Sequence, residues 1–431
     1  MSFTVSESRW RDVYFAATAR GVSVAGDFLA ATALALALQS AGAGGLAVSG
    51  MMLAIALPLV VLAPLTGRLV DRVDSRTLLV ASGLWQMLIC AALAFAEHPV
   101  AIITLCALLS SGLAVTSPTL AALLPAMVTR DDLPRASAIN QTASSVGIMV
   151  APAAAGFLVG QFGVRVPLLI DAACYLAIVA AGLLIRTRRG GAHPAPMPAD
   201  KPAASTAWRL RRDPLLGPLM VALAATLSVL SAINVVTVFF IRETLRSSET
   251  VFGLVEAVWA GGLLLGSWLV AMKARQARDE GILAQAMIVM FVGTSLVVLS
   301  AAAVPSVIWL VPIFVVGGML NGGENVVGNV IMGRRVPPAV RGRAFAAFAA
   351  AIQGASMVGY LVGGLLLEVL APRPLIVLVG GGALLVTAVS VIPIWRAVGR
   401  ERATAAGHRR APAAAEATDA VVGATPVPVG D

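Results

Sequence analysis

Twelve long apolar stretches follow one another along this chain of 431 residues. Each approaches or exceeds the ~20 residues that a helix needs to cross a bilayer. Hydrocarbon offers no partner to an unpaired backbone N–H or C=O group, so spanning segments of this length must be helical. The predicted spans lie near residues 13–38, 46–69, 77–96, 100–127, 137–160, 166–186, 215–240, 250–272, 281–303, 307–333, 343–369 and 374–396. The sequence therefore predicts an all-α integral membrane protein with twelve transmembrane helices.

The composition agrees with this prediction. Charged residues make up 12% of the sequence, about half of the share that soluble proteins carry. This excludes a soluble enzyme, a disordered chain and a disulfide scaffold. An outer-membrane barrel is disfavoured, because its strands need only about ten alternating residues each.

The basic residues give the orientation of the spans. Of the 31 Lys and Arg residues, 26 fall in segments on the side of the N-terminus, four fall on the other side, and Arg20 lies within a span. Cytoplasmic loops carry such an excess of basic residues. We therefore expect a multi-pass protein of the plasma (inner) membrane with both termini in the cytoplasm. The net charge of +9 then reflects topology, and no nucleic acid is expected as a partner.

A polar, Pro/Ala-rich and basic segment separates the first six spans from the last six. Shifting the sequence by 208 places Arg135 on Arg343 and Gly156 on Gly364, and transporter halves are commonly structural repeats. The expected organisation is a cytoplasmic N-terminus (1–12), an N-terminal six-helix bundle (13–186), a cytoplasmic linker (187–214), a C-terminal six-helix bundle (215–396) and a disordered cytoplasmic tail (397–431).

The loop between spans 2 and 3 carries the sequence GRLVDRVDSR, residues 67–76. It resembles the signature of the major facilitator superfamily, G-x-x-x-D-R/K-x-G-R/K-R/K, through Gly67, Asp71, Arg72 and Arg76. The D-R-x-D variant is similar to that of bacterial exporters that include the enterobactin and macrolide efflux proteins. The resemblance implies two six-helix bundles that work by alternating access. It also implies that Asp71 helps to lock the cytoplasmic ends of spans 2 and 11, because a helix N-terminus favours an acid.

A simpler interpretation of this loop stays open. The arginines would then only hold the loop in the cytoplasm, and Asp74 or Ser75 would cap span 3.

Span 5 contains a second pattern, in which Gly147, Pro152 and Gly156 stand at the spacing of the G-x-x-x-G-P-x-x-x-G motif of antiporters, with Ala151 in place of one glycine. The resemblance favours export. Small residues at these positions also suit tight helix packing in a transporter of either direction. Span 4 lacks the arginine that many proton-coupled antiporters carry there.

Ionisable residues inside the spans are the candidate site, because such residues usually mark a transport pathway. Arg20 and Asp27 are seven residues apart and share one face of span 1. Asp27 lies near mid-membrane, where a carboxyl group that alternately binds and releases a proton could couple transport to a gradient. The alternative is a structural acid permanently paired with an arginine or a hydroxyl group.

Further polar residues lie in spans 5, 8 and 10. Glu324 lies beside a stripe of Asn321, Asn325 and Asn329 in span 10, which predicts either a cavity wall with a protonation or cation-recognition site or ordinary interhelical hydrogen bonds. Glu256 lies towards the outer end of span 8, where it could reach interfacial water, and Asn140 in span 5 fits the family resemblance. We expect Asp27 and Glu324 to face the central cavity from opposite bundles.

Missing motifs narrow the function. The sequence has no GKS or GKT triplet for ATP coupling, and its three histidines lie outside the spans, which leaves no intramembrane serine–histidine or zinc site. We therefore predict no enzyme, no metal and no cofactor, with a proton gradient as the energy source.

The first hypothesis is a monomeric secondary active transporter that exports amphipathic small molecules, such as a drug, an antibiotic or a siderophore-like metabolite, in exchange for protons. Its partners would be the substrate, protons and membrane lipid. The alternatives are a facilitator or importer of a small solute on the same fold, and a non-transporting membrane sensor or scaffold. The last would need no acid at mid-membrane, so Asp27 argues against it.

Overall fold

A computed structural model describes residues 7–129, 131–191, 213–274, 280–337 and 340–422. Helices account for all the elements of the described chain, in agreement with the predicted all-α class. They are α1 (Trp10–Ser40), α2 (Gly44–Val61), α3 (Ala63–Arg72), α4 (Ser75–Leu93), α5 (Pro99–Met127), α6 (Leu133–Phe162), α7 (Arg165–Leu184), α8 (Leu216–Leu230), α9 (Ile233–Phe239), the π-helical turn η2 (Phe240–Thr244), α10 (Glu249–Ala274), α11 (Glu280–Ala301), the 3-10 turn η3 (Val307–Trp309), α12 (Leu310–Arg335), α13 (Arg341–Leu367) and α14 (Pro372–Val422).

Twelve helical segments in the described residues are long and apolar enough to cross a membrane, which confirms the twelve-span prediction. Two spans are interrupted. The second is shorter than predicted, since α2 ends at Val61 and α3 begins two residues later, between Pro58 and Pro64. A proline removes a backbone donor and crowds the preceding turn, which accounts for the break. The seventh span consists of α8, α9 and η2 in succession.

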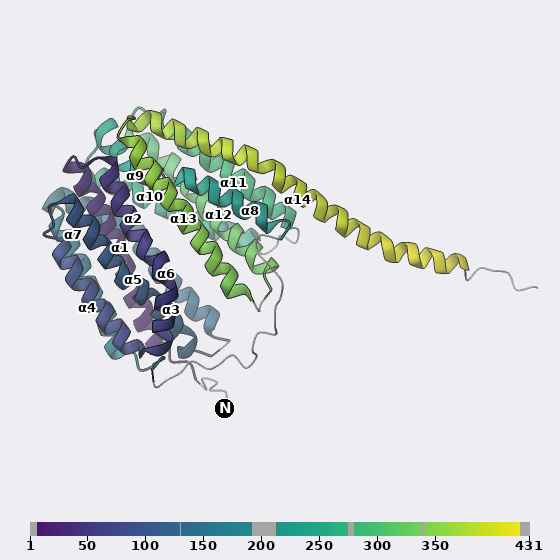
Figure 1. The fold of residues 1–431 in the computed structure, drawn as a ribbon, viewed down its shortest axis with the longest axis horizontal. Helices are drawn as coiled ribbons and strands as arrows, with labels where there is room; N and C mark the ends of the chain where they lie inside the picture. The colour runs from purple at the N-terminus through teal and green to yellow at the C-terminus, as the bar shows by residue number, and fades with distance from the viewer. Residues whose placement is uncertain (1–6, 130, 192–212, 275–279, 338–339, 423–431) are drawn as a thin grey trace, which may run out of the picture.

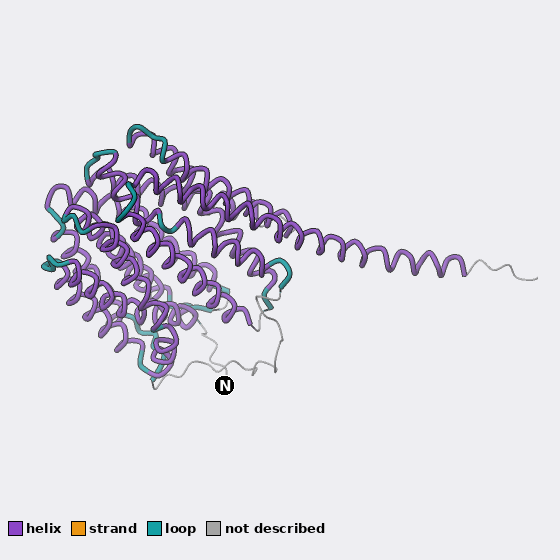
Figure 2. Tube along the Cα trace, turned by 45° about the horizontal axis from the view of Figure 1, so that its top comes forward, coloured by secondary structure: helices purple, strands orange, loops and turns teal. Residues whose placement is uncertain are grey.

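The helices form two halves, α1–α7 and α8–α14, which Figures 1 and 2 show side by side. Within the first half, α1 packs on α6 and α7, and α4 packs on α5 and α7. Within the second half, α10 packs on α12, and α11 packs on α12 and α14. Between the halves the main contacts are those of α6 with α10 and of α2 with α13.

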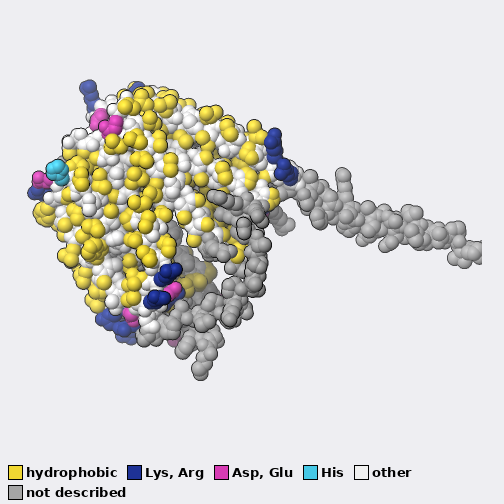
Figure 3. All heavy atoms as spheres, in the orientation of Figure 1, with side chains coloured by type: hydrophobic (Ala, Val, Ile, Leu, Met, Phe, Trp, Pro, Cys, Tyr) yellow, Lys and Arg dark blue, Asp and Glu magenta, His cyan; other side chains and the backbone are white. Residues whose placement is uncertain are grey.

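The outer surface has the character expected in lipid. Large apolar side chains point outwards, among them Leu88 (62% exposed), Val289 (68%) and Leu385 (67%). Figure 3 shows apolar side chains over most of the visible face, with charged side chains gathered towards its edges. An apolar surface band of this kind is favourable in hydrocarbon and would be a liability in water.

The two ends of the molecule differ. We call the end that holds residues 40–44, 245–249 and 367–371 the far end, and the end that holds Arg72 and Arg335 the linker end. Inter-half hydrogen bonds at the far end join Gln39 to Glu243 (3.1 Å), and the Leu46 N–H to Glu368 (3.0 Å). Towards the linker end the halves lean apart (Figure 1). The molecule is therefore closed at the far end and open at the linker end.

The predicted linker and the predicted tail are described by the structure only in part. Most of the predicted linker, residues 192–212, lies outside the described residues, and the part before it is held against the first half, where Thr187 donates two hydrogen bonds to Asp12. The tail after Arg396 was expected to be disordered, but α14 continues to Val422. This segment is rich in alanine, the strongest helix former, which accounts for the helix. The lack of an apolar pattern was therefore not a sufficient reason to predict disorder.

Candidate functional site

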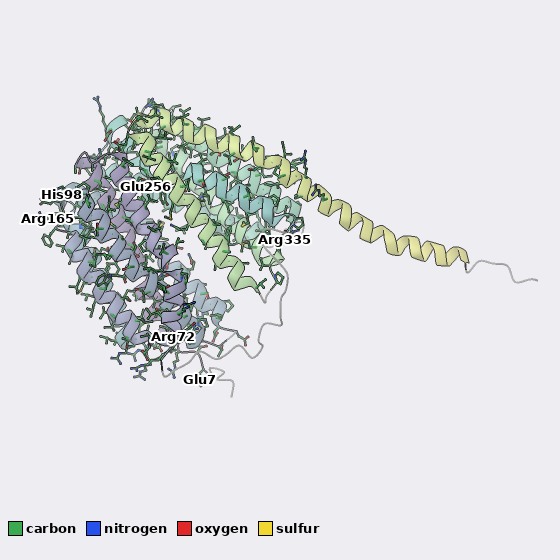
Figure 4. The ribbon with its side chains drawn as sticks, viewed as in Figure 1. Glu7, Arg72, His98, Arg165, Glu256 and Arg335 are labelled. Carbon is green, nitrogen blue, oxygen red and sulfur yellow. The ribbon has the colours of Figure 1, made fainter. Side chains whose placement is uncertain are left out.

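A cavity of about 660 Å³ lies between the two halves. The first half contributes Arg20 and Asp27 from α1 and Asn140 from α6, while Glu256 of α10 and Tyr360 of α13 belong to the second half. The inter-half contacts close it on the far side, so it faces the linker end. Figure 4 labels Glu256 nearer the far end of the bundle and Arg72 and Arg335 at its linker end.

Asp27 lines this central cavity and is held by a hydrogen bond. The Tyr175 hydroxyl of α7 donates to its Oδ1 at 2.6 Å. Arg20 stands two turns earlier on the same face of α1, and its Nη1 is buried without a hydrogen-bond partner among the described residues. The cavity wall of the first half thus offers a carboxyl group, a phenol and a guanidinium group.

Tyr175 is the residue that sequence reasoning missed. The available signal was its position, since a tyrosine four residues after Asp171 in a span places two polar groups on one helix face. Asp171 itself is fully buried, and its Oδ2 accepts from Cys90 Sγ at 3.2 Å. Its other carboxyl oxygen fills the space where a Cβ at position 26 would stand, which explains why a glycine precedes Asp27.

Glu324 does not occupy the place predicted for it. It is 3% exposed and lies within the second half, where Thr294 of α11 donates to its Oε1 at 2.6 Å and Asn321 donates to Oε2 at 3.4 Å. In the described part of the chain it lines neither the central cavity nor the smaller pocket described below. Packing against α11 turns this face of α12 away from the central cavity, which the residue spacing alone does not reveal.

The asparagines of α12 divide between two environments. Asn321 lines the smaller pocket. Asn325 and Asn329 are exposed, and each side-chain amide donates to the carbonyl group one turn earlier, at 2.9 and 2.8 Å. Most of the predicted asparagine stripe therefore forms hydrogen bonds to the backbone of its own helix.

Glu256, and not Glu324, is the acid that faces Asp27's cavity from the second half. It also lines a smaller pocket of about 220 Å³ inside the second half, and Asn234, Glu256 and Tyr360 line both spaces. Glu256 is half-buried, and no hydrogen bond or ion pair joins it to any residue that the structure describes.

In this conformation Asp71 of the loop motif pairs within its own half. Asp71 pairs with Arg189 at 3.3 Å, and Arg189 also donates to the Ala122 carbonyl at 3.1 Å. Asp74 caps α4 by accepting from the Arg76 N–H at 2.8 Å, as the simpler interpretation of the loop expects. Gly67 and Arg72 are exposed, and no described atom lies within 4 Å of the position that a Cβ on Gly67 would take. Among the described residues, therefore, no neighbouring helix packs closely against Gly67 in this conformation.

The span 5 motif lies at two helix crossings. Gly147 packs against Gly21 and Ala25 of α1, and Gly156 packs against Gly253 of α10. The carbonyl group of Pro152 also faces Gly253. The motif therefore joins α6 both to its own half and to the other half. In the described residues no three His, Cys, Asp or Glu side chains are grouped as a metal site would need.

Comparison with known proteins gives the family. Residues 16–278 match the family model of the Major Facilitator Superfamily. An uncharacterised MFS-type transporter of Bacillus subtilis (strain 168), YfiS, is 24% identical over 353 residues, which cover 80% of this chain and 84% of YfiS.

Solved structures share the fold at low sequence identity. A POT family transporter in complex with a thioalcohol-conjugated peptide has a TM-score of 0.74 at 11% identity, covering 90% of this chain and 96% of its own. A bacterial homologue of the iron transporter ferroportin in its inward-facing state has a TM-score of 0.69 at 16% identity, covering 90% and 100%. The nucleoside transporter NupG has a TM-score of 0.68 at 14% identity, covering 90% and 98%. Since the family match spans more than half of the sequence, the chain belongs to the major facilitator superfamily and is a secondary transporter rather than an enzyme.

Proposed function

We propose that the protein exports amphipathic small molecules, such as a drug, an antibiotic or a siderophore-like metabolite, in exchange for protons. The observation that carries this proposal is the position of Asp27, an acid on the wall of the central cavity with a hydroxyl donor and an arginine near it. Acids in such positions mark substrate and proton pathways in membrane proteins. We also propose that the linker end lies in the cytoplasm of a plasma membrane, as the excess of basic residues on that side indicates.

In this mechanism Asp27 alternates between two forms. When it is ionised, the Tyr175 hydroxyl group and the nearby positive charge of Arg20 stabilise it. When it is protonated, the neutral acid no longer has an electrostatic attraction to Arg20. Alternating access then requires that the two forms favour different conformations, because a ligand shifts an equilibrium only by its differential affinity.

The lining of the central cavity supports an amphipathic substrate. Apolar side chains such as Val24, Leu109 and Phe252 make up more than half of it, and polar side chains stand between them. Pockets of this composition bind ligands mainly through apolar contact and use the few polar groups for orientation. A facilitator or importer remains the alternative outcome of the test below.

The test uses Asp27→Asn in inverted membrane vesicles, with rhodamine 6G as a fluorescent amphipathic probe and an imposed proton gradient. The amide cannot carry a proton, so gradient-driven accumulation should disappear, while downhill exchange of the dye persists. Glu97→Gln is the matched control, because Glu97 is exposed at the far end with 84% of its side chain accessible. Full gradient-driven accumulation by Asp27→Asn would overturn the proposed role, and insensitivity of the unmodified protein to an uncoupler would favour the facilitator.

A further inference from the structure

The smaller pocket of about 220 Å³ adjoins the central cavity on the side of the second half. Asn234, Glu256 and Tyr360 line both spaces and so stand at their common boundary. From this geometry we infer that the pocket binds the ammonium group of an amphipathic organic cation, with Glu256 as its counter-charge and aromatic rings as its walls. This inference rests on the proposed function and assigns the substrate class for the same transport pathway.

Four aromatic side chains stand among the mostly aliphatic residues that line the pocket. Trp259 of α10 and Phe314 of α12 meet edge to face, with ring centroids 5.5 Å apart and planes at 74°. Phe240 and Tyr360 also line the pocket. A cation within about 6 Å of such ring faces is attracted by the quadrupole of the ring, and the attraction grows when water is excluded.

The described basic residues leave part of this aromatic wall free. Arg373 lies over the Phe240 ring at 5.9 Å from its centroid. In the described part of the chain no arginine or lysine stacks on Trp259, Phe314 or Tyr360. A ligand cation would therefore meet rings that no protein cation already covers.

The charge in the pocket is unbalanced. Among its lining residues Glu256 is the one charged side chain, and it has no hydrogen-bond or ion-pair partner in the described chain. Glu256 is half-buried among mainly apolar side chains, where pairing with a cation stabilises its ionised carboxylate. An organic ammonium ion supplies that partner, and its alkyl or aryl groups fit the apolar lining.

The opposite wall of the central cavity directs the cation to this pocket. Arg20 and Asp27 stand together on α1, so the positive guanidinium group offsets the carboxylate there, and Asp27 already accepts from Tyr175. No basic residue shares the lining of the smaller pocket in the described chain. Like charges repel at close range, so a cation is favoured at Glu256 and disfavoured beside Arg20.

The test measures binding and does not depend on transport. The full-length protein, in dodecyl maltoside micelles, is titrated calorimetrically with benzyltrimethylammonium, with neutral N,N-dimethylbenzamide and with anionic phenylacetate, and titrations into empty micelles are subtracted. We expect the cation to bind at least about tenfold more tightly than the amide, and phenylacetate not to bind detectably. Equal affinity for the cation and the amide in the unmodified protein would overturn the inference without reference to any variant.

Variants identify the pocket. Glu256→Gln should weaken binding of the cation by about tenfold or more and leave binding of the amide unchanged, and Trp259→Leu should weaken the cation more than Trp259→Phe does. Glu97→Gln is the control and should bind like the unmodified protein. Unchanged cation affinity in Glu256→Gln would overturn the inference.

Asp27→Asn separates the two proposals. It should keep the cation affinity while it loses gradient-driven accumulation. Full accumulation by Asp27→Asn together with a Glu256-dependent cation site would refute the proton-carrier role and leave the binding site intact. Loss of gradient-driven accumulation in Asp27→Asn, together with a cation affinity that Glu256→Gln leaves unchanged, would refute the cation site and leave the proton-carrier role intact.

Discussion

The far end and the linker end of the molecule are held by different means. At the far end backbones of opposite halves are in direct contact, where Gly156 meets Gly253 and Gly45 meets Gly364. At the linker end Asp71 pairs with Arg189 inside the first half, and Arg335 pairs with Asp213 inside the second. Contact through glycines leaves no room for adjustment, whereas a largely exposed side chain such as that of Asp71 can exchange partners at little cost.

The two glycine contacts are equivalent positions of the two halves. Gly45 and Gly253 differ by 208 in number, and so do Gly156 and Gly364, which is the shift at which the sequence repeats. The far end is therefore closed by two equivalent helix crossings between the halves. Opening that end must separate both crossings together, which makes closure cooperative.

Glu368 adds an electrostatic contact to the far end. Its carboxylate accepts from the Leu46 N–H at 3.0 Å, at the start of α2. An acid at a helix N-terminus is stabilised by the helix dipole. This is the kind of contact that the family resemblance implies for Asp71 at the opposite end, so the two ends can use the same physics in alternate conformations.

The largest expected effect comes from filling a glycine crossing. A Cβ at position 253 would lie 2.9 Å from the Cα of Gly156, so Gly253→Leu cannot keep the far end closed. We expect a shift of about 3 kcal/mol or more towards the conformation with an open far end. Spin labels at Ser40 and Ser248, one in each half, should report a longer distance, and rhodamine 6G transport should be lost. Gly261→Leu on the same helix is the control, because no described atom lies within 4 Å of its Cβ position.

The next effect concerns Asp71. If it faces the N-terminus of α13 when the linker end closes, Asp71→Ala removes that contact and favours the conformation seen here by about 1–3 kcal/mol. The lost pair with Arg189 subtracts little, since 64% of the Asp71 side chain is exposed. The Ser40–Ser248 distance distribution should then narrow towards its short value. An unchanged distribution with normal transport would leave Asp71 only its topological role.

Glu368→Ala should act in the opposite direction. It removes the acceptor for the Leu46 N–H and the favourable charge at the start of α2, so the far end should open more often, by about 1 kcal/mol. The same pair of labels measures the shift. Glu97→Ala, which removes an exposed acid at the same end, should leave the distribution unchanged, and an equal response of both variants would refute a specific role for Glu368.

The sequence predicted the features that the bilayer itself imposes. Span count and repeat follow from hydropathy and from small residues such as Gly156 and Gly364, because lipid leaves the chain no alternative to packed helices. Which acid faces the cavity depends on the rotation of each helix about its axis, and that is set by neighbours distant in sequence. Glu324 is drawn to Thr294 of α11, whereas Glu256, towards the end of its span, reaches the cavity.

Arg189→Ala should give the smallest shift, and its sign is informative. In the conformation described here Arg189 holds Asp71 within the first half at 3.3 Å, and removing this partly exposed pair should cost less than about 1 kcal/mol. Asp71 would then be free to face α13, so the equilibrium should move towards the open far end, opposite to the effect of Asp71→Ala. The double variant should behave like Asp71→Ala, because without the carboxylate Arg189 has nothing to restrain. Shifts of the same sign in both single variants would show that the pair only holds the loop in place, and that closure of the linker end does not depend on an exchange of partners by Asp71.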